Sequence, residues 1–431
     1  MTLHRRDFLR AAGLGAAAAV TVPGLRAWAD APPSERIRLG FIGVKNQGTA
    51  NLKAFLKLPA AQVVALCDVD TKVLAAAKGL VEKEGKGSPV QTFGDYRKLL
   101  DSKDVDAVVV VTPDHWHAIP TIHACMAGKD VYCEKPLSLT VAEGQAMVKA
   151  ARKYNRVVQT GSQQRSEYKG YFRIAAELVR GGKLGALKGI TVGIPKVNWD
   201  QHAVKGAKDG PPPPELDYDF WLGSAPQRPY NVNRVHYLFR FFWDYSGGQM
   251  TNFGAHDLDI VQWALGMDES GPVEVSGTVE YDKEHRFEVP AQQEMTFRYA
   301  NGVTVVCGQK HRGSCTFEGE KGTIHVDRKK LEVKPDELLK GVPTKEYEAK
   351  YRDGVAHRAN WLECVKSRQT PNADVAIGHR SATVCHLGNI AVRTGRTIKW
   401  DPAGEQIIGD RAASAMLART YRKPYELPAV T

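Results

Sequence analysis

Two places in this sequence carry side chains that could move a proton or hold a developing negative charge. Asn252 and His256 lie four residues apart in a stretch, residues 250–265, whose pattern predicts a helix, so their side chains share one face. The imidazole of His256 is a natural proton acceptor near neutral pH, and Asp259 could orient it. Lys135 follows a short apolar stretch, and its ammonium could donate a hydrogen bond to a hydroxyl whose oxygen becomes an alkoxide.

Each of these side chains also has an ordinary structural explanation. Asn252 could cap the start of the helix while His256 is hydrogen-bonded inside the core. Lys135 could be a surface lysine in a turn, which is the commonest position for any lysine. The local sequence does not decide between these alternatives, so the decision depends on the elements that surround them.

A glycine-containing turn near the start of the chain predicts a dinucleotide site. Residues 37–42 form a short, mainly apolar strand, and Gly43 and Gly48 then lead into a helical segment at 49–58. One glycine permits the sharp turn, the other lets the helix pack close to the strand, and the helix N-terminus attracts a pyrophosphate. Lys45 occupies the position of the usual middle glycine, where a side chain obstructs phosphate unless its ammonium pairs with it.

A carboxylate after the second predicted strand indicates NAD rather than NADP. Residues 62–67 read Q-V-V-A-L-C, and Asp68 follows directly. A carboxylate at this place accepts hydrogen bonds from ribose hydroxyls and repels a 2′-phosphate. We therefore expect NAD as the cofactor. The alternative is a solvated turn with Asp68 and Asp70 on the surface.

The elements needed to position these residues alternate between strand and helix up to about residue 160. The β-branched run 107–111 is typical of a central parallel strand that is covered on both faces. This rhythm predicts an α/β Rossmann domain with a doubly wound parallel sheet, and ligands bind beyond the carboxyl ends of such strands. The following part of the chain predicts an α+β domain with an antiparallel or mixed sheet. Its expected strands are at 273–280, 287–299, 303–309, 314–318 and 322–326, and its later helices are at 355–367 and 375–393. We expect a Rossmann domain at 30–160 and a second domain at 161–431.

Composition excludes several classes of protein. The chain has 431 residues and a formal net charge of +11, but its Lys and Arg are scattered rather than clustered with aromatic residues. We therefore expect no nucleic-acid partner. Cys307, His311 and Cys315 are evenly spaced, but they bracket a predicted hairpin turn without a Cys-x-x-Cys pair, so we expect no metal.

Residues 1–29 have the features of a signal for export. Arg5 and Arg6 are followed by Phe-Leu-Arg, then by a mild apolar stretch at 11–22 and by the small-x-small pattern Ala-Trp-Ala at 27–29. This resembles a twin-arginine signal peptide, which predicts a periplasmic or extracytoplasmic protein and no membrane span in the mature chain. An uncleaved anchor or a disordered tail is the alternative. An exported enzyme has no free pool of nicotinamide cofactor, so it must hold NAD tightly and restore it within each cycle.

Several motifs, taken in order, resemble the glucose–fructose oxidoreductase/inositol dehydrogenase/MocA (Gfo/Idh/MocA) family. They are G-F-I-G-V-x-x-x-G at 40–48, Asp68, T-P-D-H-W-H at 112–117, E-K-P at 134–136 and G-G-Q-M-T-N-F-G-A-H-D-L-D at 247–259. The resemblance covers about residues 37 to 400. It implies a Rossmann domain, a second domain with a large open, mainly antiparallel sheet that commonly mediates homo-oligomers, and hydride transfer between NAD and a hydroxyl-bearing carbon of a sugar or cyclitol.

The resemblance also implies roles for individual residues. Lys135 matches the catalytic lysine and His256 the catalytic histidine, whereas Asn252 stands where dehydrogenases of the family usually carry an aspartate. The cofactor-binding residues would be Gly43, Lys45, Gly48, Asp68, Thr112, Pro113, His117, Glu134 and Lys135, with Trp116 beside them. Side chains that could stack on a sugar or bond its hydroxyls are Gln163, Gln164, Arg165, Trp199, Arg234, His236 and Trp243.

Three functions fit these observations. The first is an exported oxidoreductase that transfers hydride between a tightly held NAD and a sugar or cyclitol. The second is a glycoside-cleaving enzyme that uses NAD transiently, through oxidation, elimination, hydration and reduction. The third is a carbohydrate-binding protein that kept the fold and lost catalysis, which Lys45 and Asn252 favour and the pair Lys135 and His256 disfavours.

Overall fold

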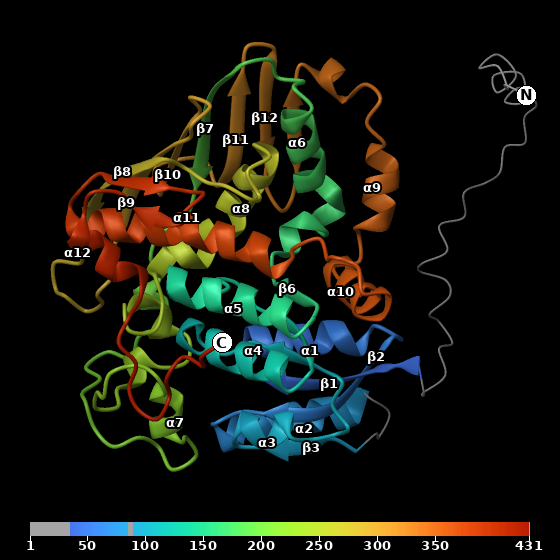
Figure 1. Ribbon diagram of the computed structural model, residues 1–431, viewed down its shortest axis with the longest axis vertical. Helices are drawn as coiled ribbons and strands as arrows, with labels where there is room; N and C mark the ends of the chain where they lie inside the picture. The colour runs from blue at the N-terminus through green and yellow to red at the C-terminus, as the bar shows by residue number, and fades with distance from the viewer. Residues whose placement is uncertain (1–34, 85–88, 431) are drawn as a thin grey trace, which may run out of the picture.

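The computed structural model describes residues 35–84 and 89–430. An N-terminal α/β domain lies below a second domain built on a wide sheet (Figure 1). The predicted signal, residues 1–29, lies outside the described residues. Within them, none of the helices is both long enough and apolar enough to cross a membrane.

Six parallel strands form the first sheet in the order β3-β2-β1-β4-β5-β6, which confirms the predicted doubly wound sheet. The strand order reverses between β1 and β4, and this reversal opens the crevice in which such folds bind ligands. All four residues of β4 are buried, as expected for a central strand. The strands are β1 (Ile37–Ile42), β2 (Ala61–Cys67), β3 (Gln91–Phe93), β4 (Ala107–Val110), β5 (Asp130–Cys133) and β6 (Val158–Thr160).

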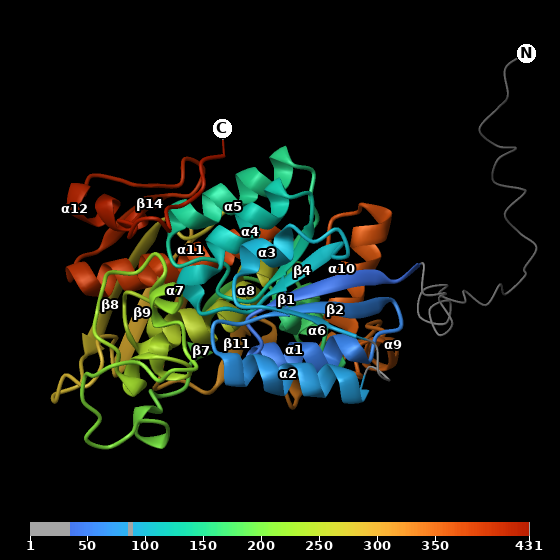
Figure 2. The ribbon, with the colours of Figure 1, turned by 90° about the horizontal axis from the view of Figure 1, so that it is seen from below.

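Helices cover both faces of this sheet (Figure 2). Phe41 of β1 packs on Phe55 of one pair of helices, α1 (Gln47–Leu56) and α2 (Thr71–Glu84). Val108 and Val110 of β4 point to the opposite face, into a second apolar cluster. The helices of that face are α3 (Tyr96–Leu100), α4 (Ala118–Met126) and α5 (Val141–Lys153).

A nine-stranded sheet, antiparallel except where β7 pairs with β10, forms the second domain and confirms the predicted mainly antiparallel architecture. Its order is β13-β12-β11-β7-β10-β9-β8-β14-β15. The strands are β7 (Leu187–Gly193), β8 (Glu274–Glu280), β9 (Gln292–Arg298), β10 (Thr304–Gly308), β11 (Ser314–Gly319), β12 (Gly322–Val326), β13 (Leu331–Lys334), β14 (Ile398–Asp401) and β15 (Gln406–Ile407).

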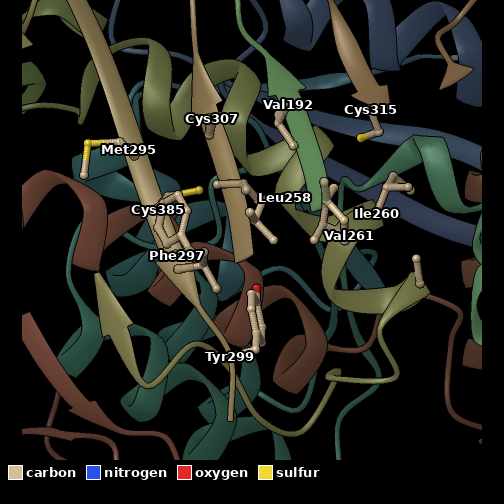
Figure 3. Close-up of a cluster of buried hydrophobic side chains, with 14 of the residues drawn as sticks. Val192, Leu258, Ile260, Val261, Met295, Phe297, Tyr299, Cys307, Cys315 and Cys385 are labelled. Atoms are coloured by element: carbon tan, nitrogen blue, oxygen red, sulfur yellow. The ribbon is translucent and has the colours of Figure 1, made fainter. Parts of the chain in front are cut away.

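One face of this sheet is covered by three helices, and the other is open. Along β9, Met295 and Phe297 are buried, while Thr296 is half-buried and Arg298 exposed on the opposite face. Side chains of α8 (Ala255–Ala264), among them Leu258, point at the buried residues of the strands (Figure 3). The covering helices are α6 (Tyr171–Arg180), α8 (Ala255–Ala264) and α11 (Val375–Thr394).

The segment between β7 and α8 has little regular structure and carries an aromatic cluster. We expected a strand over 287–299, but β9 begins at Gln292. Phe287 and Val289 pack instead with Trp199 and neighbouring rings in this cluster, which removes them from the sheet. The short helices outside the main layers are α7 (Tyr218–Leu222), α9 (Thr344–Lys350) and α12 (Arg411–Ser414).

Two segments from the C-terminal half of the chain return to the first domain. Helix α10 (Ala356–Ser367) packs Trp361 against Phe55 and Tyr132. The ring centroid of Trp361 lies 5.7 Å from that of Phe55 and 5.8 Å from that of Tyr132. The C-terminal tail, residues 419–430, runs from the second domain toward α7 and ends beside α4 and α5 (Figure 1). Its Tyr425 packs against Trp116 at 5.5 Å. Both segments contribute to the core of the first domain.

Candidate active site

A cavity of about 390 Å³ lies at the carboxyl ends of the parallel strands. Its walls come from the turn after β1, the residues after β2, the loop after β4 and the residues after β5. The second domain closes it with the segment before α8 and with side chains from the aromatic segment. This is the position that the strand order predicts for a ligand.

The glycine turn is shaped for close packing around a nucleotide. Gly43 has φ of +86°, and a Cβ atom there would lie 2.6 Å from the carbonyl oxygen of Val111. A Cβ atom on Gly48 would lie 2.4 Å from the carbonyl oxygen of Gly43, so that glycine allows α1 to pack on the turn. Gly43 and Lys45 line the cavity, whereas Gly48 is buried behind it. The N-terminus of α1 therefore faces the cavity, with the side chains of Lys45, Asn46 and Gln47 beside it.

Asp68 is held firmly at the cavity wall. Its Oδ2 accepts a hydrogen bond from the backbone N–H of Val44 at 2.9 Å, and its Oδ1 accepts one from that of Asp70 at 3.0 Å. Burial raises the pKa of the Asp68 carboxyl. A fixed carboxylate opposite the helix terminus suits the ribose hydroxyls of NAD. These residues fit the predicted cofactor.

Lys135 lies at the second-domain side of the same cavity. Its Nζ donates to the backbone oxygen of Asn252 at 2.7 Å and to Asn252 Oδ1 at 3.0 Å. The amide of Asn252 is itself fixed, since its Nδ2 donates to Gln249 Oε1 at 2.9 Å. Burial lowers the pKa of Lys135 to about 8. A lysine that can be either charged or neutral near physiological pH thus contacts the cavity.

The helix that carries Asn252 is not the continuous α-helix that we expected over 250–265. Met250–Gly254 forms a π-helical turn, and α8 begins only at Ala255. A π turn is wider than an α turn and is frequent at functional sites. Here it presents both the side chain and the backbone oxygen of Asn252 to Lys135.

His256 lines the cavity next to this pair and is almost fully buried. Burial, the charge of Lys135 and the charge of Arg328 hold its pKa well below 6.5, so the imidazole is neutral at pH 7. We expected Asp259 to orient it, but that expectation is wrong. Asp259 accepts hydrogen bonds from Arg165 at 2.7 and 2.9 Å, because a buried guanidinium is a stronger partner than a neutral imidazole. Nδ1 of His256 has no partner among the described residues.

The loop after β4 contacts the end of β5, which carries Lys135, through the side chain of His117. His117 places its ring nitrogens 2.6 Å from the oxygen of Pro136 and 2.9 Å from that of Thr112. Thr112, Pro113 and His117 all line the cavity, and so does Trp116. His117 therefore fixes the spacing of the two strand ends.

Glu134 connects the cavity to both domains. Its Oε1 accepts from Asn51 Nδ2 of α1 at 2.9 Å and from Gln163 Nε2 at 2.8 Å. Of the nine residues expected to bind the cofactor, eight line the cavity. The ninth, Gly48, lies behind it and allows α1 to pack on the turn.

Of the seven possible sugar contacts, two line the cavity. Gln163 does so beside Glu134, and His236 does so with Nε2 at 3.6 Å from an oxygen of Asp70. The other five lie elsewhere in the structure, and they are Gln164, Arg165, Trp199, Arg234 and Trp243.

Each of these five has a structural partner that explains its placement. Arg165 is 2% exposed and forms ion pairs inside the second domain, and Gln164 donates to Asp257. Trp199 is part of the aromatic cluster. Arg234 pairs with an aspartate of the same irregular segment, and Trp243 lines a separate cavity, stacked under an arginine of α11.

Five charged residues that line the cavity were not anticipated from the sequence: Asp114, Glu167, Arg240, Arg328 and Arg358, of which Glu167 and Arg358 pair with each other. Asp114 is buried, lines the cavity and accepts a hydrogen bond from Ser246. Arg240 and Arg328 line the cavity from the second domain. Asp114 lies within the T-P-D-H-W-H motif, so the motif itself contained a signal. Nothing in the sequence around either arginine connects it with Lys135.

Comparison with known proteins agrees with this geometry. Residues 37–162 match the description "Oxidoreductase family, NAD-binding Rossmann fold", and residues 174–427 match "Oxidoreductase family, C-terminal alpha/beta domain". A "Glycosyl hydrolase family 109 protein" of Shewanella pealeana is 34% identical over 172 residues, which span 36% of this chain and 38% of that protein. The match thus spans little more than a third of the relative's length.

Solved structures share the fold at low sequence identity. The WlbA dehydrogenase of Bordetella pertussis, in complex with NADH and UDP-GlcNAcA, superposes with a TM-score of 0.65 at 21% identity, covering 86% of this chain and 99% of that one. A levoglucosan dehydrogenase in complex with NADH and levoglucosan gives 0.64 at 17% identity, with 84% and 99% covered. The aldose-aldose oxidoreductase of Caulobacter crescentus gives 0.61 at 21% identity, with 84% and 99% covered.

Proposed function

The chain belongs to the Gfo/Idh/MocA family of NAD-binding oxidoreductases, and from this premise we propose that it transfers hydride between a tightly held NAD and a hydroxyl-bearing carbon of a sugar or cyclitol. One observation carries the proposal. Lys135 and His256 line the same cavity as Gly43 and Asp68, so proton-transfer groups and the dinucleotide site share one space.

The residues of the site have different roles in the oxidation of a hydroxyl. When bound, NAD supplies the hydride acceptor. Lys135 is charged below a pH of about 8 and exchanges its bond to Asn252 for one to the substrate oxygen as that oxygen gains negative charge. His256 is neutral and takes the hydroxyl proton. The reverse transfers return the hydride and the proton when a carbonyl is reduced.

Asn252 positions Lys135 but does not take a proton. An amide is a hydrogen-bond donor and acceptor and has no titration near neutral pH. The proton must therefore go to His256, because Lys135 already carries its own proton below a pH of about 8. His256 is buried and Lys135 is half-buried, which excludes much of the water that could otherwise accept the proton.

Export adds a requirement for a closed redox cycle. The proposed twin-arginine signal would deliver the folded chain to the periplasm, where no free NAD pool exists. The enzyme then recovers NAD⁺ by passing the hydride to a second carbonyl or back to the product. We also propose a homo-oligomer that packs through the open face of the second sheet, to be measured by light scattering after size-exclusion chromatography.

A second candidate, redox-neutral glycoside cleavage, is favoured by the similarity to the glycosyl hydrolase family 109 proteins. Oxidation of a ring hydroxyl makes the adjacent C–H acidic. A base removes that proton, the C–O bond to the leaving group breaks, water adds to the resulting double bond, and the returning hydride restores the hydroxyl. Electrons balance within the cycle, so no NADH accumulates.

One assay separates the candidates. Protein purified from the periplasm is first tested by native mass spectrometry for retained NAD. It is then incubated with sugars, cyclitols and p-nitrophenyl glycosides, and p-nitrophenol and reduced nicotinamide are quantified together. Oxidised sugar formed together with a reduced second carbonyl supports the oxidoreductase with its closed cycle, whereas reduced nicotinamide that accumulates in proportion to product would exclude that cycle. Glycoside cleavage is supported by release of p-nitrophenol without accumulation of reduced nicotinamide, together with incorporation of deuterium from the solvent at the carbon next to the oxidised one. NAD-free protein that turns over nothing leaves only a carbohydrate-binding role.

A further inference from the structure

Two arginines at the catalytic side of the cavity have no acidic partner. Arg240, in the turn Leu238–Phe241, and Arg328, in the turn after β12, line the cavity together with Lys135 and His256. Neither guanidinium forms an ion pair with any residue that the structure describes. Unpaired arginines are uncommon in a half-enclosed site, because a nearby carboxylate usually compensates their charge.

Aromatic rings hold both guanidinium groups in place without neutralising them. Arg240 lies 4.0 Å from the ring centroid of Tyr237 and donates from Nη1 to the backbone oxygen of the same residue at 2.6 Å. Arg328 lies at the exposed mouth of the cavity, 5.2 Å from the ring of Tyr168 and 5.9 Å from that of Phe253. Stacking fixes the plane of a guanidinium and leaves its N–H groups free to bind a ligand.

The carboxylates that line the cavity are, by contrast, already engaged. Every one of them accepts a hydrogen bond from a neighbouring group, as seen for Asp68 with Val44, Asp70 with Lys72, Asp114 with Ser246, Glu134 with Asn51 and Glu167 with Arg358. The oxygens of these carboxylates are thus occupied by donors, whereas most N–H groups of Arg240 and Arg328 have no acceptor among the described residues.

The charges of both arginines act on the catalytic pair. Burial is the main reason that the pKa of Lys135 falls to about 8; Glu134 and Asp114 raise this pKa, and Arg240 and Arg328 lower it. Arg328 also lowers the pKa of His256. The pyrophosphate of NAD does not account for these arginines, because it belongs at the N-terminus of α1, beside Lys45.

We propose that Arg240 and Arg328 bind an anionic substituent of the substrate, so that the enzyme acts on acidic sugars in preference to neutral ones. The substituent is a carboxylate, a sulfate or a phosphate ester, whose oxygens match the planar fork of N–H donors. This inference rests on the proposed function and specifies the substrate class of the same site.

The test compares acidic sugars with their neutral parent on the NAD-loaded protein. D-glucuronate, D-glucose 6-sulfate, D-glucose 6-phosphate and D-glucose are titrated by calorimetry at two salt concentrations. At least one acid should bind about 10- to 100-fold more tightly than glucose, as expected for charge-assisted hydrogen bonds, and less so at high salt. The acid that binds best identifies the substituent.

Variants assign the preference to the two arginines. Arg328→Gln and Arg240→Gln should each reduce the ratio of acid to glucose affinity, and Arg328→Lys should keep part of it, because the charge remains while the fork is lost. Lys329→Gln, which removes an exposed cation next in the chain and outside the cavity, is the matched control and should keep the ratio. Glucose affinity equal to that of all three acids would overturn the inference, as would a preference that survives in the double glutamine variant.

The same samples separate this inference from the proposed function. Acid binding that depends on both arginines, without reduction of the nicotinamide by any sugar, would contradict the oxidoreductase proposal and support the acidic substrate class. Reduction of the nicotinamide by neutral sugars, with no preference for acids in binding, would support the oxidoreductase and contradict the inference.

Discussion

At the scale of single residues, the protonation state of Lys135 sets a prediction for pH dependence. Because burial lowers the pKa of this lysine to about 8, it loses its proton, and with it the ability to stabilise an alkoxide, as pH rises through that value. kcat/KM should therefore fall above a pH of about 8. It should be flat through neutrality, because the pKa of His256 lies well below 6.5.

A pH profile of kcat/KM checks this expectation. Lys135→Arg is the matched variant, since an arginine stays charged and should lose the alkaline fall even if its activity is low. A rate that keeps rising above pH 8 would contradict the assigned role, because it would make the neutral amine of Lys135 the base.

A second prediction concerns the neighbours of this lysine. His256→Ala should lower kcat by about two to four orders of magnitude, the usual cost of losing a positioned general base. Asn252→Ala should cost much less, because Lys135 keeps its bond to the backbone oxygen of residue 252. Asn252→Asp should move the alkaline fall to higher pH, since an adjacent carboxylate favours the charged lysine.

Steady-state kinetics of the three variants, each with its cofactor content measured, test this ranking. A His256→Ala enzyme as active as the parent would exclude the proposed proton acceptor. An Asn252→Asp enzyme with an unchanged profile would show that the amide does not control Lys135.

Sequence alone predicted the side chains that follow strand ends and missed those that come from distant turns. Gly43, Asp68 and Lys135 each follow a strand of the parallel sheet, and parallel strands bring their ends together. Arg240 and Arg328 reach the site from irregular segments, whose path depends on tertiary packing. Chemical type alone misplaced five of the seven possible sugar contacts, because stacking rings and hydrogen-bonding side chains are also what a buried cluster needs.

At the scale of elements, the predicted helix at 250–265 shows the limit of periodicity. A π turn and an α-helix have similar apolar patterns, so the sequence does not reveal that Met250–Gly254 is wound more widely. Helices 355–367 and 375–393 were predicted closely and correspond to α10 and α11. Their apolar pattern could not tell which sheet each of them covers.

A third prediction concerns the link between the segment 163–165 and α8. Arg165 is 2% exposed and pairs with Asp259, which is fully buried, so Arg165→Ala leaves a buried carboxylate without its partner. Breaking such a pair costs roughly 3–5 kcal/mol of the free energy of unfolding. Urea denaturation should show this loss.

Arg312→Ala is the matched control for Arg165→Ala, because Arg312 belongs to the same domain and forms a surface pair with Glu332. Its effect should be far smaller, since water screens such pairs. Equal effects of the two substitutions would contradict the structural role of Arg165 and would return it to the candidates for substrate contact.

At the scale of the whole molecule, the fold class could be predicted but the path of the chain could not. Alternating strands and helices followed by consecutive strands are sufficient for the two architectures. The return of α10 and of the tail 419–430 to the first domain depends on Trp361 and Tyr425 finding aromatic partners, and a linear pattern does not specify partners.

A fourth prediction concerns export. Arg5→Lys with Arg6→Lys should block processing after Ala29 and leave the precursor in the cytoplasm, because the twin-arginine route depends on that pair. Cell fractionation with mass spectrometry of the N-terminus measures both results. Normal processing of the double variant would contradict the proposed route.

The return of the tail and of α10 also determines when the chain can fold during its synthesis. A nascent chain that has emerged only as far as β6 lacks Trp361, which later covers Phe55 and Tyr132, and lacks the Arg419 that bonds Glu143 of α5 at 2.8 Å. Its nucleotide-binding half would expose apolar surface until almost the whole polypeptide has left the ribosome. A chain that stops before Trp361 therefore lacks part of the core of the nucleotide-binding domain, and we expect it to bind NAD less firmly than the full chain.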